Sequence, residues 1–210
     1  MKKLVLLFII LLIGKTVTVY GQTDTAFWFA APEVDEIPYQ GFNQDRPIVL
    51  NISTYGKAAI VTVSQPANGG MPIRVKSIPA NASDSIDLTA WIDLIECKPA
   101  NTILNKGLKI SSTVPISVYY EVNANHTNPD LFALKGKNSL GKDFWISSQN
   151  ILDNSAGQYS SFNIVATENN TTVTINPSKD IVGHVAGSPF NTVLNKGQTY
   201  AAIADRKSVV

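Results

Sequence analysis

Apolar and polar residues alternate along most of this chain. From Ile116 to Val122, every second residue is isoleucine, valine or tyrosine, and the residues between them are serine, tyrosine and glutamate. Because successive side chains of a strand point to opposite faces, a period of two predicts a strand with one buried face. The same alternation recurs along the chain, which predicts a protein built mainly from β-sheet.

Some of these segments are close enough in the sequence to form hairpins. Residues 50–63 contain two apolar segments around Gly56, and residues 162–175 contain two around Asn169-Asn170. Asparagine tolerates a positive φ, so an asparagine pair suits a tight turn between strands. The pattern therefore predicts two β-hairpins. Prolines are expected at the boundaries of the apolar runs, at Pro66, Pro79, Pro115 and Pro177.

One segment departs from this period. Apolar side chains recur there at spacings of three and four residues, at Leu88, Trp91, Ile92 and Ile95. This spacing is typical of one face of a helix, and Thr89 is in position to act as its N-cap. The sequence therefore predicts an all-β fold with one short helix packed on a sheet.

The strand pattern is repeated within the chain. Three pairs of segments match in order, at offsets of 117, 112–113 and 112 residues: Ala26–Phe29 with Asp143–Ile146, residues 51–54 with 163–167, and residues 61–63 with 173–175. The near-constant offset predicts two β-sandwich-like units in tandem. A fourth match, of residues 102–107 with 192–197, has an offset of 90 and is interpreted as a reused strand-turn element. The second unit would then lack its final strands and leave a sheet edge unpaired.

Both ends of the chain differ from the part between them. Lys2, Lys3 and the apolar run from Leu4 to Ile13 form the pattern of a secretory signal peptide, with cleavage expected after Gly21. This run is too short to remain as a membrane span. Residues 205–210 match the translation of a sequencing adapter, which predicts a truncated gene; an ordinary charged tail is the alternative.

These features divide the sequence into five segments. We expect a signal peptide (1–21), a first β unit (22–126), a connecting segment (127–142), an incomplete second β unit (143–204) and an adapter-derived tail (205–210).

Composition narrows the classes of function. The chain is 44% hydrophobic and 16% charged, which argues against intrinsic disorder. Its net charge of +1 lacks the strong positive charge that is typical of a nucleic-acid-binding protein. Residues 22–204 alone hold 12 basic and 15 acidic residues, a net charge of −3. The single cysteine, Cys97, excludes an internal disulfide and a multi-thiolate metal site, and two histidines leave little material for a metalloenzyme.

The chain has no recognisable catalytic motif. Gly-x-Ser-x-Gly, His-Glu-x-x-His and phosphate-binding glycine runs are all absent. The acidic residues are scattered, and those around the short helix, including Glu96, are interpreted as solvated charges. We therefore predict no catalytic residue, no cofactor and no metal. Cys97 is expected to be partly buried and unreactive, and His184 to make one hydrogen bond beside a sheet.

The loop 123–130 is rich in oxygen-bearing side chains that could bind Ca²⁺. It contains one carboxylate, however, and hard cations prefer more negative charge. A turn built from asparagine and aspartate is the favoured interpretation.

Trp28 and Trp145 occupy matching positions in the repeat, beside Phe27 and Phe144. Exposed aromatic faces could stack on sugars. Aromatic residues at equivalent strand positions are more typical of core anchors, which bury about 150–250 Å² each. We therefore expect both tryptophans to hold the interior of their units together.

A group of strand and turn segments carries a family likeness: Gly141–Ile146, Ile164–Ile175, Leu194–Tyr200, Leu104–Ile110 and Pro115–Tyr120. Together they resemble the IgGFc-binding protein N-terminal domain family. The resemblance implies a β-sandwich-like module of large secreted or surface proteins, notably of Bacteroidetes. No binding residue of the family is defined well enough to be transferred to this chain.

These observations predict a secreted, non-enzymatic binding or adhesion module of a larger bacterial cell-surface protein, which contacts a protein or glycan. The alternatives are a carbohydrate-active enzyme domain, which would need paired carboxylates in a cleft, and a structural spacer. Loops on rigid β scaffolds commonly carry recognition, so the loops 38–46 and 123–130 are the candidate contact surface. Its candidate residues are Tyr39, Phe42, Arg46, Asn125, His126 and Asp130.

Overall fold

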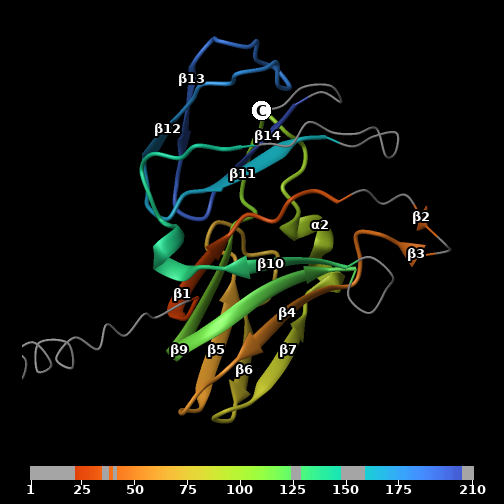
Figure 1. Ribbon diagram of the computed structural model, residues 1–210, viewed down its shortest axis with the longest axis vertical. Coiled ribbons are helices and arrows are strands. Elements are labelled where there is room, and N and C mark those ends of the chain that lie inside the picture. The colour runs from red at the N-terminus through yellow and green to blue at the C-terminus, as the bar shows by residue number, and fades with distance from the viewer. Residues whose placement is uncertain (1–21, 35–37, 40–41, 124–128, 148–158, 205–210) are drawn as a thin grey trace, which may run out of the picture.

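The computed structural model describes residues 22–34, 38–39, 42–123, 129–147 and 159–204 (Figure 1). The predicted signal peptide and the predicted adapter-derived tail lie outside these residues, as do Asn125 and His126. Strands dominate, and the only α-helix among the described residues is one turn long. The prediction of an all-β fold with one short helix is confirmed.

One long strand organises the first unit. Strand β9 (Leu108–Val122) pairs through its first half with β1 (Asp24–Phe29) and β5 (Ala59–Ser64). Its second half pairs with β4 (Ile48–Ser53) and β10 (Asp130–Leu134). All four pairings are antiparallel, so a single strand joins four others that lie far apart in the sequence.

Two further strands extend this sheet to the order β6-β5-β9-β4-β7. They are β6 (Arg74–Ile78), which pairs with β5, and β7 (Ser83–Asp87), which pairs with β4. The predicted hairpin around Gly56 is therefore wrong, because β4 and β5 do not pair with each other. Both instead follow the same strand, β9, one after the other.

Pro115, predicted to lie at the boundary of a strand, lies inside β9. Ser112 is the last residue of β9 that pairs with β5, and Ser117 is the first that pairs with β4. Proline has no backbone N–H, so the middle of a sheet normally excludes it. The change of partner at this point leaves no ladder bond for Pro115 to break.

Alternating side chains of β4, β5 and β9 form the core of the first unit. Burying each such aliphatic side chain stabilises the fold by roughly 1.5–3 kcal/mol. Twelve of these residues are at most 2% exposed: Ile48, Leu50, Ile52, Ala59, Val61, Val63, Leu108, Ile110, Ile116, Val118, Tyr120 and Val122.

The predicted helix is present as a 3-10 turn, η1 (Thr89–Trp91), followed by α2 (Ile92–Ile95). Ile92 and Ile95 are buried in the core, as the apolar spacing predicts. Thr89 is not the N-cap; its hydroxyl instead accepts a hydrogen bond from Ile48 N at 2.9 Å. The first turn is therefore tied to the start of β4.

The second unit contains four strands: β11 (Ser161–Val165), β12 (Thr171–Ile175), β13 (Phe190–Leu194) and β14 (Thr199–Ile203). Strand β11 pairs with β14, and β12 pairs with β13. The predicted hairpin around Asn169-Asn170 is thus wrong as well, although Asn170 does adopt a positive φ of 56°. A separate core, which includes Leu194 and Tyr200, lies between these strands.

The two units use the same strand pairing in the same register. Ile52 and Ile164 are equivalent in the repeat; Ile52 pairs with Asp84 in β7, and Ile164 pairs with Tyr200 in β14. Every other pair in the two ladders follows the same correspondence. The β5–β6 and β12–β13 ladders correspond in the same way, with Ala59↔Ile78 matching Thr171↔Leu194. The second unit therefore repeats β4 to β7 of the first.

A short segment of the first unit joins it to the second. Strand β8 (Ile103–Leu104) pairs with β14, and Gly107 N donates to Gly197 O at 3.1 Å. The backbones are so close here that a Cβ on Gly107 would lie 2.7 Å from Gly197 O. Cys97 and Ala201 are buried together at this junction.

The aromatic residues at the repeat positions do not behave as predicted. In β1 the core residue is Phe27, which is 0% exposed. Trp28 is half-buried and lies on the opposite face, below the ammonium groups of Lys109 and Lys196. Trp145 is outside any strand and 100% exposed, so the prediction that it anchors a core is wrong.

We expect Gly107→Ala to weaken the contact between the units, because the added methyl group meets backbone that cannot move aside cheaply. Such overpacking costs typically about 1–3 kcal/mol. Gly56→Ala is the matched control, since its Cβ would have no neighbour within 4 Å. Urea denaturation of both variants measures the difference. An equal effect of the two substitutions would show that the close approach at Gly107 does not constrain the junction.

Candidate functional site

The two candidate loops leave the first unit at the same end of the sheet. Ile48, at the start of β4, pairs with Val122, and Val122 pairs with Asp130 at the start of β10. Arg46 lies just before β4, and Asp130 begins β10 with an exposed side chain. The structure therefore places the end of the first loop next to both described ends of the second.

The first loop contains a small ladder of two strands. Pro38–Tyr39 (β2) pairs with Phe42–Asn43 (β3). The structure describes the backbone pairing of Tyr39 with Phe42 but not the side chains of these two residues. Asn125 and His126 of the second loop also lie outside it, so the predicted contact residues stay a prediction.

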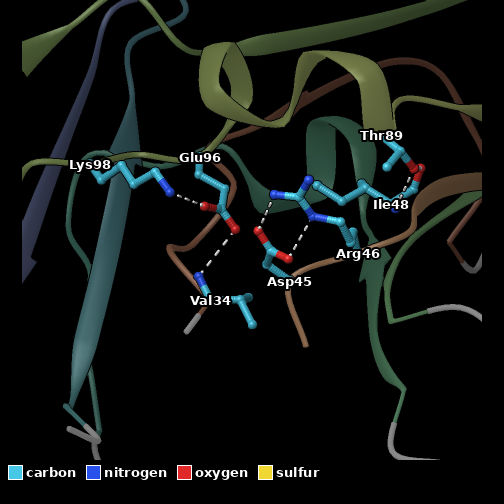
Figure 2. A network of polar contacts seen from close by, with 7 residues as sticks. All are labelled: Val34, Asp45, Arg46, Ile48, Thr89, Glu96 and Lys98. Atoms are coloured by element: carbon cyan, nitrogen blue, oxygen red, sulfur yellow. Dashed lines mark hydrogen bonds and ion pairs between the residues drawn. The ribbon is translucent and has the colours of Figure 1, made fainter. Parts of the chain in front are cut away.

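An ion pair between a buried carboxylate and a partly exposed guanidinium lies at the base of the first loop. The guanidinium of Arg46 donates to both carboxylate oxygens of Asp45, from Nε at 2.9 Å and from Nη2 at 3.0 Å (Figure 2). The side chain of Asp45 is 0% exposed, whereas that of Arg46 is 41% exposed. This fork geometry satisfies the buried carboxylate and holds Arg46 in one orientation at the edge of the surface.

A second buried carboxylate fixes the other end of the same loop. Glu96 accepts a hydrogen bond from Val34 N at 3.2 Å, and the ammonium of Lys98 lies 3.0 Å from its other oxygen (Figure 2). Burial raises the pKa of Glu96; Lys98 and Val34 N oppose this rise, and the nearby Asp45 adds to it. The two ends of residues 34–45 are therefore held by buried, partly neutralised acids.

Tyr120 of β9 is buried in the core of the first unit. Burial raises the pKa of its hydroxyl, and the charges of Glu96, Cys97 and Asp45 raise it further. The hydroxyl has no hydrogen-bond partner among the described residues. Its ring packs against Phe29, with the ring centroids 4.7 Å apart, and near Phe132 of β10. The three rings form an aromatic cluster within the core of the first unit.

The arrangement anchors loops more readily than it performs chemistry. Each acid is held by its own cation, so neither is free to act as a general base. Burial raises the pKa of Cys97 to about 11, which disfavours the reactive thiolate. The side chain is 0% exposed, so it is buried more deeply than the partial burial that the sequence predicts. His184 shares a hydrogen bond with Asn101 Oδ1 at 3.0 Å, beside β14, which agrees with the prediction. Residues 22–204, as far as they are described, contain no cluster of three potential metal ligands.

Sequence reasoning missed this network. The interpretation of Glu96 as a solvated charge next to the helix is wrong, because Glu96 is 0% exposed. Asp45 is also buried and belongs to no motif. The sequence held one weak indication that Glu96 is buried. Glu96 lies directly between two residues expected in the interior, Ile95 and Cys97, and a solvated side chain is less common between two such neighbours.

Comparison with known proteins agrees with the family resemblance. A sequence model of the family described as "IgGFc binding protein" matches residues 130–207, a segment that includes β10 and the whole second unit. The resemblance to the IgGFc-binding family is thereby confirmed for this segment. That description names a binding protein, not an enzyme.

No curated protein matches the chain. Among solved structures, the crystal structure of Thermotoga maritima 1070 is similar to this chain with a TM-score of 0.37. The two sequences are 13% identical, and the match covers 54% of this chain and 97% of that chain. Within the described part of the chain, no helix is long and apolar enough to cross a membrane.

The raised pKa of Glu96 predicts a pH dependence of stability. Above the ordinary glutamate value of 4.5, the unfolded chain loses a proton that the folded chain still holds. This difference stabilises the folded state at low pH, and the gain disappears as the pH rises through the raised pKa. We expect the free energy of unfolding of the wild type, relative to Glu96→Gln, to fall over that window. Denaturant melts at several pH values measure it, with Glu33→Gln as the control for losing an exposed carboxylate.

Tyr120→Phe should raise the free energy of unfolding. An unpartnered buried hydroxyl costs about 1–3 kcal/mol, and the substitution removes it without leaving a large cavity. Tyr119→Phe is the matched control, because this neighbouring hydroxyl donates to Gln22 Oε1 at 3.2 Å. We expect no gain from the control. If Tyr120→Phe were the more destabilising of the two in urea melts, the hydroxyl of Tyr120 would have a partner in solution.

Proposed function

We propose that this protein is a non-enzymatic binding module of an exported bacterial surface protein, and that the loops 38–46 and 123–130 contact its protein or glycan partner. The family match carries the first part of this proposal, because the description of the family names binding. The second part rests on the convergence of both loops beside Ile48, Val122 and Asp130.

The chemistry of the loops suits recognition. Tyrosine, tryptophan and arginine dominate the binding energy of many interfaces, and the first loop contains Tyr39, Phe42 and Arg46. Arg46 is partly exposed but held by the buried Asp45. A side chain that is already ordered loses less conformational entropy on binding. The ion pair therefore favours affinity as well as fixing the loop.

Export is the part of the proposal that rests on the sequence. Residues 1–21 have the charged start, apolar run and small terminal residue of a signal peptide. The family resemblance implies modules of large secreted or surface proteins, which agrees with export. A spacer without a ligand is the competing function, and a carbohydrate-active enzyme is opposed by the pairing of both buried acids with cations.

Binding of the purified protein to a glycan array and to immobilised mucins tests the proposal. The Fc fragment of immunoglobulin G, which the family description names, is a third probe. We expect at least one surface to bind, and the double variant Tyr39→Ala/Phe42→Ala to bind it at least about tenfold more weakly. Tyr159→Ala is the matched control, since Tyr159 is exposed and lies in the second unit.

Two results would contradict this function. If the protein bound none of the glycans, the mucins and the Fc fragment, a structural spacer would be the remaining function. Equal weakening by the loop variant and by Tyr159→Ala would place the contact surface elsewhere.

A further inference from the structure

One strand of the first unit, β9, has no counterpart among the described residues of the second unit. In the first unit β4 and β5 pair on one side with β7 and β6, and both pair on the other side with β9. In the second unit β11 and β12 keep the equivalent pairings with β14 and β13. Among the described residues, no strand takes the position of β9 beside them.

The backbone of β11 presents unpaired groups on that side. Ala204 N donates to Ser160 O, and Ala166 N donates to Gln198 O, so the even-numbered residues of this segment bond towards β14. Because bonding alternates along an antiparallel strand, Ser161, Asn163 and Val165 direct their backbone groups away from β14. Their equivalents in the first unit, at positions 49, 51 and 53, face β9.

Side-chain burial shows the same gap. Leu50 and Ile52 of β4 are at most 1% exposed, whereas the equivalent Phe162 and Ile164 of β11 are only half-buried. Val61 of β5 is 0% exposed, and its equivalent Val173 is again half-buried. The inner face of the second unit is thus apolar but incompletely covered.

The segment Asp143–Ile146 matches a strand of the first unit in the repeat but pairs with no described strand. Its equivalent in the first unit, Ala26–Phe29, belongs to β1, and β9 is the one described strand that pairs with β1. Phe27 is 0% exposed, but the equivalent Phe144 is 63% exposed. The exposure of Trp145 and Ile146 has the same explanation, because no described strand is available for them to pair with.

We propose that the open side of β11 and β12 is a docking site for one extended strand with the pattern of β9. The strand would run antiparallel to both, as β9 runs against β4 and β5. It would be about as long as β9, with aliphatic or aromatic residues at alternate positions facing Phe162, Ile164 and Val173. The segment Asp143–Ile146 would then fold along its free edge, as β1 does.

The occupant is a single strand and not a second copy of this fold. A second copy would offer its own β11 edge, which is five residues long. β9 has fifteen residues and spans two strands in succession. Only a segment of that length can reach β11, β12 and Asp143–Ile146 together. This site lies on the second unit and is independent of the loops proposed for recognition.

A peptide with the sequence of Leu108–Val122 is the direct probe. The control peptide has the same composition with the apolar alternation scrambled. On the full chain, we expect the first peptide to slow hydrogen exchange at residues 161–165 and 171–175 at least about tenfold, and to leave β4 and β5 unchanged. Fluorescence of Trp145, identified with Trp145→Phe, should shift to the blue as its ring becomes buried.

Proline substitutions locate the docked strand. Asn163→Pro removes an N–H that faces the proposed site and leaves the ladder with β14 intact, so it should weaken peptide binding by roughly tenfold relative to Asn163→Ala. Ser161→Pro against Ser161→Ala repeats the test at the first residue of β11, where proline is better tolerated. Circular dichroism without peptide confirms that each variant is folded.

A version of the chain with the same fifteen residues tethered after residue 210 raises the effective concentration of the strand to about the millimolar range. We expect the same protection in this version. The proposal is overturned if neither the free nor the tethered strand protects β11 and β12, or if the scrambled peptide protects them equally. Equal binding to the proline and alanine variants would also overturn it. So would sedimentation of the chain as a dimer whose interface protects this edge.

Discussion

The pairing of β9 with four other strands is the constraint on which the first unit depends. Buried backbone groups must be hydrogen-bonded, and β9 satisfies β1 and β5 through one half and β4 and β10 through the other. Its alternate side chains close the core that these strands share. The strand is continuous across Pro115 because its partners change there, so two sets of strands become one cooperative structure.

The second unit shows how the counterparts of β4 to β7 pair when no described strand takes the place of β9. The ladders β11–β14 and β12–β13 keep the register of their counterparts, so neighbouring strands and turns are sufficient to specify them. The inner face remains partly exposed, and no described strand pairs with Asp143–Ile146. Contact with β8 and the close approach of Gly107 to Gly197 hold this unit against the first.

Buried charge has a positional role at the loop end of the first unit. Asp45 and Glu96 are costly to bury, and each is compensated by a cation and by geometry that fixes the chain on either side of residues 34–45. A buried ion pair adds little net stability compared with apolar packing. The two pairs do fix the described ends of the loop, at Val34 and at Asp45-Arg46.

The strands, the short helix and the repeat could be predicted from the sequence alone, because the period of a buried face and the spacing of Leu88 to Ile95 are local properties. The one side-chain hydrogen bond of His184 was predicted as well, whereas the full burial of Cys97 was not. Which strands pair depends on the tertiary structure, since β4 and β5 meet β9 from more than 40 residues away. The tertiary structure also decided that Glu96 is buried and Trp145 exposed, because burial depends on distant segments that cover a residue, and alternation along one strand carries no information about them.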